Sequence, residues 1–299
     1  MTSSPDQPAG DPARPADPFD PAFLQGFRTY DDLGPGRRWS TWQQVEPLCR
    51  GPEPRPTWVV TEQAAVDTEL GVLKTGKEAD VFLLRRAVED PAPGPGGSVE
   101  RSVVMAAKRY RSPEHRSFHR TAAYAEGRRG KDSREARAAA KGTAFGRSVQ
   151  ASQWAEAEWT SLRRCWDLGL PVPYPVQLDG TELLMEWIQV DGETAPRLAQ
   201  TRPGPVLLRD WFEQLREVMA TLAQDGLVHG DLSAYNVLAA GERLVVIDLP
   251  QAVDLVGPHG ASFLLRDCAN VCAWFRGRGL DSAVADEHAL LADLMGSAF

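Results

Sequence analysis

The stretch "HGDLSAYNVL" (residues 229–238) sets an acid and an amide five positions apart, directly after the apolar run "GLV". Asp231 could accept a proton from an attacking hydroxyl group, and the amide oxygen of Asn236 could hold a magnesium ion. Twelve residues after Asn236, the predicted strand "LVVID" ends at Asp248, a second oxygen ligand for a metal. A turn or a helix cap would explain any one of these residues alone, but the three in this order predict a magnesium-phosphate site.

The composition of the 299 residues is that of an ordinary globular protein, with 42% hydrophobic and 25% charged residues. No segment reaches the roughly 18 uninterrupted apolar residues of a membrane span, and the N-terminus lacks the features of a secretory signal, so we expect no membrane partner. Four scattered cysteines form no disulfide framework, which predicts a cytoplasmic protein. Cys268 and Cys272 lie four apart on a predicted helix and are expected to be buried apolar residues rather than metal ligands.

The charge of the chain is uneven. Residues 111–147 hold ten Lys or Arg against four Asp or Glu, a net charge of +6. Because the whole chain has a net charge of −8, the remaining residues together carry −14. This basic segment could contact the phosphate groups of RNA, and a solvated loop explains it equally well.

The chain around residues 229–238 divides into a strand-rich part and a helix-rich part. Residues 1–20 are predicted to be disordered, and residues 21–57 to dock loosely outside a regular core. Alternating or apolar runs predict strands, and recurrence at three and four residues predicts helices. The predicted strands are 71–74, 79–86, 102–110, 171–180, 181–188 and a hairpin over 236–248; the predicted helices are 148–169, 207–226, 262–280 and 282–295.

This order of elements predicts an α+β fold with two lobes in one domain over residues 58–299. The N-lobe is β-rich, over about 58–185, and the C-lobe is mostly helical, over about 188–299. A cleft between two lobes is a usual place for a ligand.

The glycine turn "GVLKTGK" (residues 71–77) fits the first seven positions of a P-loop, but Glu78 stands where that motif needs Ser or Thr. A predicted strand follows instead of a helix, so we exclude a P-loop NTPase. The turn is either an ordinary hairpin or one that approaches a nucleotide closely, as Gly76 permits.

Lys108 lies inside the apolar run "VVMAAK". A buried lysine is costly without an anionic partner, although at a strand end it can also extend to solvent. The helix predicted over 148–169 offers two carboxylates, Glu156 and Glu158, which point to different faces, so at most one of them faces the lysine.

Taken together, the segments "KTGKEADVF", "AAKRY", "WAEAEW", "MEW", "LVHGDLSAYNVL" and "VVIDLPQAV" resemble the RIO family of atypical protein kinases, and its first branch most of all. The resemblance covers about residues 58–280. It implies a reduced kinase fold, with an N-lobe of strands plus one helix and a helical C-lobe.

The resemblance also implies roles for individual residues. Asp231 would be the catalytic base, and Lys108 would contact the α- and β-phosphates and pair with Glu158, or else with Glu156. The ligands of magnesium, or of manganese in its place, would be Asn236 and Asp248. The remaining nucleotide contacts would be Lys74, Thr75, Gly76, Lys77 and Glu78 over the phosphates, Val81, and the hinge residues Met185, Glu186, Trp187 and Ile188 at the adenine.

The sequence therefore predicts an ATP- and magnesium-dependent serine/threonine protein kinase, able to phosphorylate itself, whose protein substrate is unknown. Gly230 stands where ordinary protein kinases carry Arg, so control by phosphorylation of an activation loop is not expected. Two alternatives remain: an ATPase switch acting on ribosomal or other RNA–protein particles, and a small-molecule phosphotransferase.

Overall fold

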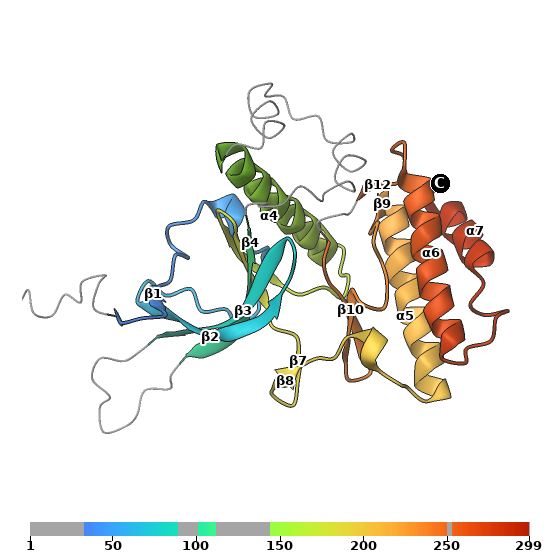
Figure 1. Cartoon of the computed structure of the whole chain (residues 1–299), viewed down its shortest axis with the longest axis horizontal. Helices are drawn as coiled ribbons and strands as arrows, with labels where there is room; N and C mark the ends of the chain where they lie inside the picture. Colours follow the sequence, from blue (N-terminus) through green and yellow to red (C-terminus); the bar gives the residue numbers. More distant parts are fainter. Residues whose placement is uncertain (1–32, 89–100, 112–143, 250–252, 299) are drawn as a thin grey trace, which may run out of the picture.

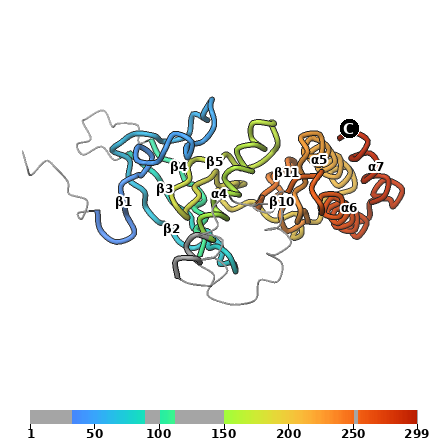
Figure 2. Tube along the Cα trace, turned by 90° about the horizontal axis from the view of Figure 1, so that it is seen from above, coloured from blue at the N-terminus to red at the C-terminus, as the bar shows by residue number. Residues whose placement is uncertain are grey.

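The structure, a computed structural model, describes residues 33–88, 101–111, 144–249 and 253–298 (Figure 1). The prediction for residues 1–20 and nearly all of the basic segment lie outside these residues. Seen from above, the N-lobe sheet and the C-lobe helices occupy opposite ends of the molecule, with β10 between them (Figure 2). This arrangement confirms the predicted two-lobed α+β fold. None of the helices in the described ranges is long and apolar enough to cross a membrane.

A six-stranded antiparallel sheet forms the N-lobe, in the order β1-β2-β3-β4-β6-β5. The predicted strands are confirmed, and the first of them begins six residues earlier than the sequence indicated. The strands are β1 (Arg37–Trp39), β2 (Ala65–Thr75), β3 (Ala79–Val88), β4 (Ser102–Tyr110), β5 (Pro175–Asp179) and β6 (Glu182–Glu186).

The two faces of this sheet are covered differently. Because side chains alternate along a strand, Ala106 and Leu183 face the long helix α4 (Ala144–Asp167), where they share a core with its Trp159 and Leu162. The opposite face carries Leu84, Met105 and Ala107, and it packs against Trp42, Val59 and Tyr174. One face thus belongs to α4 and the cleft, and the other to the N-terminal segment.

The expectation that residues 21–57 stay outside a regular core is wrong from Arg37 onward. Strand β1 pairs with β2, Trp42 is 3% exposed, and the short helix η2 (Pro47–Cys49) lies against α4, where Trp159 donates a hydrogen bond to the Leu48 carbonyl. A three-residue edge strand reading Arg-Arg-Trp has no alternation for a pattern to detect, which is why the sequence did not predict it.

The C-lobe is built on three helices, α5 (Pro205–Gln224), α6 (Gly260–Gly277) and α7 (Glu287–Ala298). The last helix begins five residues later than predicted, because the Asp286 side chain accepts the backbone N–H groups of His288 and Ala289 and so caps the helix. Two-residue to four-residue strands complete the lobe: β7 (Gln189–Val190) with β8 (Glu193–Thr194), β9 (Leu227–Val228) with β12 (Val253–Asp254), and the predicted hairpin β10 (Val237–Ala240) with β11 (Arg243–Val246); a short helix, η3 (Leu198–Gln200), follows β8.

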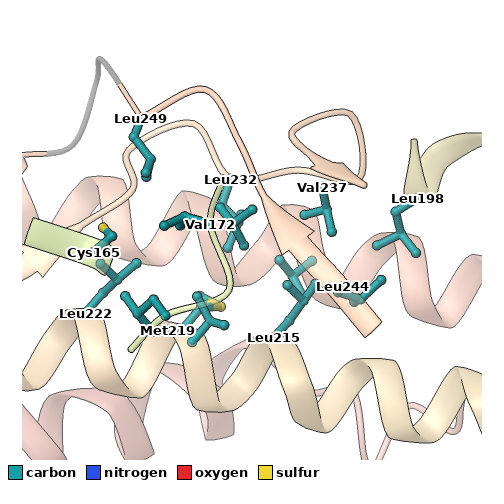
Figure 3. Packing of buried hydrophobic residues seen from close by; sticks show 14 of the residues in the cluster. Cys165, Val172, Leu198, Leu215, Met219, Leu222, Leu232, Val237, Leu244 and Leu249 are labelled. Atoms are coloured by element: carbon teal, nitrogen blue, oxygen red, sulfur yellow. The ribbon is translucent and has the colours of Figure 1, made fainter. Parts of the chain in front are cut away.

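The two loops that carry Asp231 and Asp248 are anchored in the core of the C-lobe. Leu232 and Leu249 point down toward Leu222 and Met219 of α5 (Figure 3). Each of these leucines is 1% exposed, and each directly follows an aspartate, Asp231 or Asp248. Burying the leucines fixes the backbone from which both carboxylates project. Cys268 and Cys272 are 0% exposed, as predicted for apolar helix residues.

Candidate active site

Lys108 joins the two lobes. Its Nζ donates hydrogen bonds to Glu158 Oε1 of α4 and to Asp248 Oδ1 of the C-lobe, both at 2.8 Å. The Glu158 side chain is 1% exposed, that of Lys108 is 13% exposed, and that of Asp248 is 44% exposed. The charge network therefore runs from the buried core of the N-lobe to a partly exposed carboxylate of the C-lobe.

The electrostatics favour the charged forms of Lys108 and Asp248, whereas burial raises the pKa of Glu158. Burial lowers the pKa of Lys108, but the charge of Glu158, with Tyr110 and Asp248, raises that pKa well above its ordinary value. The Lys108 ammonium in turn holds the pKa of Asp248 below its ordinary value. Tyr110, whose own pKa is raised by burial and by Glu158, donates its hydroxyl to Glu158 Oε2. The cleft thus presents a cation beside a carboxylate that stays charged at neutral pH.

The geometry selects Glu158 over Glu156 as the partner of Lys108. Glu156 is exposed on the other side of α4. The fully buried positions of this helix recur at 151, 155, 158, 162 and 165, which is the spacing of one helical stripe. The sequence held this signal, because residue 158 follows Ala155 by three and precedes Leu162 by four.

The loop over residues 229–236 carries the other two predicted residues. Asn236, which is 7% exposed, donates its amide N–H to the Asp231 carbonyl at 2.8 Å and to Asp231 Oδ2 at 3.3 Å. This fixes the amide so that its oxygen is turned away from Asp231. Asp231 itself is partly exposed, so its carboxylate can meet an incoming hydroxyl group.

His229 ties this loop to the segment that carries Asp248. Its Nδ1 accepts the Asp231 N–H at 3.3 Å, which leaves Nε2 to donate to the Ile247 carbonyl at 3.2 Å. Burial lowers the pKa of His229, so the ring is neutral and both bonds can form. The His229 ring therefore connects the backbone of Asp231, the candidate base, with the residue before Asp248, the candidate metal ligand.

Helix α6 anchors the same loop through residues that the sequence analysis missed. Asp267 accepts the backbone N–H groups of Gly230 at 2.8 Å and Leu232 at 2.9 Å, and Asn270 donates to the Leu232 carbonyl at 3.1 Å. Burial raises the pKa of Asp267 to about 7, against the two hydrogen bonds, which lower it. A carboxylate three residues after the buried Leu264, on an apolar helix stripe, is the signal that could have identified it.

The sequence predicted that a strand ends at Asp248. This is wrong, because β11 ends two residues earlier, at Val246. The backbone of Asp248 has φ 67°, a left-handed conformation that a strand cannot continue and that non-glycine residues rarely adopt. Such strain is found where a side chain must be aimed at a site, and here it turns the carboxylate toward Lys108.

The glycine turn lies between β2 and β3 and reaches the cleft. A Cβ on Gly76 would lie 2.8 Å from the Ala79 carbonyl oxygen, so this position requires glycine. Burial lowers the pKa of Lys74, as does the charge of Arg197; burial raises the pKa of Glu78, as does the charge of Asp248. Both side chains thus lie within electrostatic range of the site. Glu78 is half-buried, whereas Lys74, Thr75 and Lys77 are exposed.

The predicted hinge connects the lobes after β6. Met185 pairs with Ala106 and is buried, the Glu186 side chain accepts the Tyr174 N–H at 3.1 Å, and the Trp187 indole donates to Thr194 at 3.0 Å. The side chains of Glu186 and Trp187 are thus engaged in holding the hinge. Val81, half-buried, stands opposite Lys108 in the sheet and on the same face, toward the cleft.

The donors present fit a magnesium ion accompanied by phosphates. Among the described residues, no three His, Cys, Asp or Glu side chains gather as a metal cage. Mg²⁺ needs no such cage, because it is usually held by one or two protein oxygens while phosphates and waters fill the other positions. The Asn236 amide oxygen and the Asp248 carboxylate are oxygen donors of this kind.

Comparisons with known proteins agree with this geometry. The family model described as "RIO domain" matches residues 98–289 of the chain. The chain is 41% identical over 130 residues to "RIO-type serine/threonine-protein kinase Rio1" of Haloferax volcanii, a match that covers 43% of the chain and 44% of that relative. It is 36% identical over 134 residues to "Serine/threonine-protein kinase RIO3" of Bos taurus, covering 44% of the chain and 26% of that relative.

The matched region spans less than half the length of either relative. Among solved structures, the crystal structure of the Rio2 kinase from Chaetomium thermophilum matches with a TM-score of 0.47 and 19% identity, over 77% of the chain and 63% of that structure.

Proposed function

The chain belongs to the RIO-domain family, and from this premise we propose that it is an ATP- and magnesium-dependent serine/threonine protein kinase that can also phosphorylate itself. The observation that carries the proposal is the meeting of Lys108, Glu158 and Asp248 from the sheet, α4 and the C-lobe at one cleft. A cation held between a buried and an open carboxylate suits the binding of phosphates beside a metal.

In this proposal each residue of the cleft has one task. Lys108, oriented by Glu158, contacts the α- and β-phosphates, and the hinge backbone over residues 185–188 holds the adenine. Asn236 and Asp248 would hold Mg²⁺, which supplies charge neutralisation at the phosphate oxygens when bound. Val81 and the turn over residues 74–78 cover the nucleotide from the N-lobe.

Asp231 accepts the proton of the attacking hydroxyl group. The hydroxyl oxygen forms a bond to the γ-phosphorus, the bond from that phosphorus to the β,γ-bridging oxygen breaks, and ADP leaves with the electron pair. The hydrogen bonds from Asn236 and the tether through His229 hold the carboxylate where the hydroxyl group must arrive. In this step the chain contributes position and charge.

We also propose the domain division as a β-rich N-lobe over about 58–185, to which β1 adds, and a C-lobe over about 188–299. The four free cysteines support the proposal that the protein works in a reducing cytoplasm.

One further observation favours a second candidate function. The basic segment, with its balance of +6 on an otherwise acidic chain, suits an ATPase switch whose turnover gates contact with RNA or a ribosomal particle. The same cleft would then release phosphate to water instead of transferring it to a protein.

Incubation of the purified protein with ATP labelled at the γ-phosphate and Mg²⁺ distinguishes these functions. A kinase leaves stable label on Ser or Thr of itself or of an added protein, and Asp231→Asn lowers that labelling by about 10²–10⁴-fold while the fold survives. Asp293→Asn, an exposed carboxylate on α7, serves as the matched control and keeps full labelling. Phosphate release stimulated by RNA, without stable label, would favour the ATPase switch, and label on an added small molecule would favour a small-molecule phosphotransferase.

A further inference from the structure

Arg197 is a half-buried arginine beside the cleft that none of the roles above includes. It lies between β8 and η3, just after the hinge. Its backbone pairs with that of Leu238 in β10, and the neighbouring Pro196 carbonyl accepts the Ala239 N–H at 2.8 Å. The backbone of Arg197 is therefore fixed to the strand that directly follows the loop over residues 229–236.

The guanidinium of Arg197 reaches that loop. Its Nη1 donates a hydrogen bond to the backbone carbonyl of Tyr235, and Tyr235 directly precedes the metal-ligand candidate Asn236. Asn236 in turn donates to Asp231. The positive charge thus stands one residue from the candidate metal ligand, on the loop that carries the candidate base.

Lys74 approaches the same place from the N-lobe. Burial and the positive charge of Arg197 lower its pKa, and the charge of Asp248 raises it, so Lys74 lies within electrostatic range of both side chains. Among the ion pairs of the described residues, neither Arg197 nor Lys74 has a carboxylate within 4.0 Å. The two positive charges repel each other, and an anion bound beside the Arg197 guanidinium, which Nη1 ties to the Tyr235 carbonyl, would relieve that repulsion.

We propose that Arg197 is a further catalytic residue, which binds the γ-phosphate of ATP together with Lys74 and so makes the site distinguish a triphosphate from a diphosphate. This inference rests on the proposed function. Its basis is position: Lys108 is occupied deep in the cleft by Glu158 and Asp248, whereas Arg197 stands at the loop from which the phosphate is transferred. The Tyr235 carbonyl engages Nη1 and leaves the other N–H groups of the guanidinium for phosphate oxygens.

The alternative is that Arg197 only supports the loop through Tyr235. That role would affect every nucleotide alike, because ATP and ADP share the adenine, ribose and α- and β-phosphates. A contact to the γ-phosphate affects ATP alone. The ratio of the two affinities therefore separates a contact to the substrate from a structural support.

The test is to measure the binding of a non-hydrolysable ATP analogue and of ADP, each with Mg²⁺, to the full chain and its variants. We expect Arg197→Met to weaken analogue binding by about tenfold or more and to change ADP binding by less than about twofold. Arg197→Lys, which keeps the charge and guards against loss of folding, retains part of the preference. Arg202→Met, an exposed arginine five residues further on, is the matched control and leaves both affinities unchanged.

Adding Lys74→Met to Arg197→Met should weaken analogue binding by less than the product of the two single effects, because both side chains contact one phosphate. Equal losses for the two nucleotides in Arg197→Met, or no loss for either, would overturn the inference and leave the proposed kinase intact. A wild-type protein that binds neither nucleotide would overturn the proposed function itself.

Discussion

The two faces of the N-lobe sheet each bury a cation, and the two sites are built in opposite ways. On the face covered by the N-terminal segment, Arg86 is 0% exposed and donates to Asp67 at 2.7 and 2.9 Å and to Gln177 at 2.9 Å. Gln177 in turn donates to Thr41 at 2.8 Å. On the face toward α4, Lys108 shares its charge between the buried Glu158 and the exposed Asp248.

The difference between the faces separates a closed structural network from the one to which we assign a function. The partners of Arg86 all belong to the N-lobe, and solvent does not reach them, so no ligand can enter. Lys108 takes one partner from each lobe, and the carboxylate of the C-lobe is open to solvent. A ligand with phosphates and a metal can therefore take the place between Lys108 and Asp248 without unfolding the lobe.

Replacing Arg86 by Met should cause the largest change, and in stability alone. The substitution removes both short hydrogen bonds to the buried Asp67 and leaves it Arg38, whose Nε lies 3.7 Å from Asp67 Oδ2. The free energy of unfolding should therefore fall by about 3 kcal/mol. Denaturant titration measures this loss, and turnover per folded molecule should stay near that of the wild type. The double variant Arg86→Met/Asp67→Asn, which removes both charges, should recover part of the stability. A tenfold loss of turnover in folded Arg86→Met would break the distinction between the faces.

Replacing Lys108 by Met should do the reverse. The loss of the phosphate contact should lower turnover by about 10²–10³-fold, because transition-state charge is no longer neutralised on that side. Steady-state label transfer measures the effect, and circular dichroism checks the fold. Since Glu158 is left buried without a cation and keeps, among the described residues, only the Tyr110 hydroxyl as a side-chain donor, Lys108→Met/Glu158→Gln serves as the control for folding. Turnover within a few-fold of wild type in either variant would contradict the assignment of Lys108.

Replacing Glu158 by Gln should have a smaller effect of the same kind. The amide keeps the volume and can still accept the lysine hydrogen bond, so we expect turnover to fall about tenfold, through misplacement of Lys108. Glu156→Gln, on the exposed side of the same helix, is the matched control and should change nothing. Equal losses in both variants would show that α4 acts through general charge rather than through this pair.

A further prediction concerns the pH dependence of stability and Asp267, which anchors the candidate base loop from α6. Its folded pKa of about 7 lies above the ordinary value of about 3.9, so the folded state binds more protons between these values. Its contribution to stability therefore falls as pH rises from about 4 to about 7, and is constant above. The free energy of unfolding of the wild type minus that of Asp267→Asn should decrease as the pH rises through that window. A difference that grows with pH would contradict this behaviour.

The sequence predicted those parts of the molecule that follow from a pattern within a single segment. Strands β2 to β6 and helices α4 to α6 were evident from alternation and helical recurrence. Lys108 stood out because a charged residue interrupted an apolar strand. The stripe through Ala155 and Leu162 even held the answer to which glutamate pairs with it.

The remainder depends on contacts between segments that no local pattern encodes. Arg86 and Asp67 look like ordinary alternating strand residues until residues 37–60 cover them. Asp267 meets Gly230 across 37 residues, and Arg197 meets Tyr235 across 38. Both pairings use backbone groups on one side, so no second side chain marks them in the sequence.

A crystal structure of the protein with a non-hydrolysable ATP analogue and Mg²⁺ would show whether the phosphates and the metal ion insert where Lys108 now contacts Asp248. We expect phosphate oxygens within hydrogen-bond distance of Lys108 Nζ, a retained contact between Lys108 and Glu158, and coordination of the cation by Asn236 and Asp248. A nucleotide bound elsewhere, with the Lys108–Asp248 contact at 2.8 Å unchanged and no cation beside Asn236, would contradict this expectation.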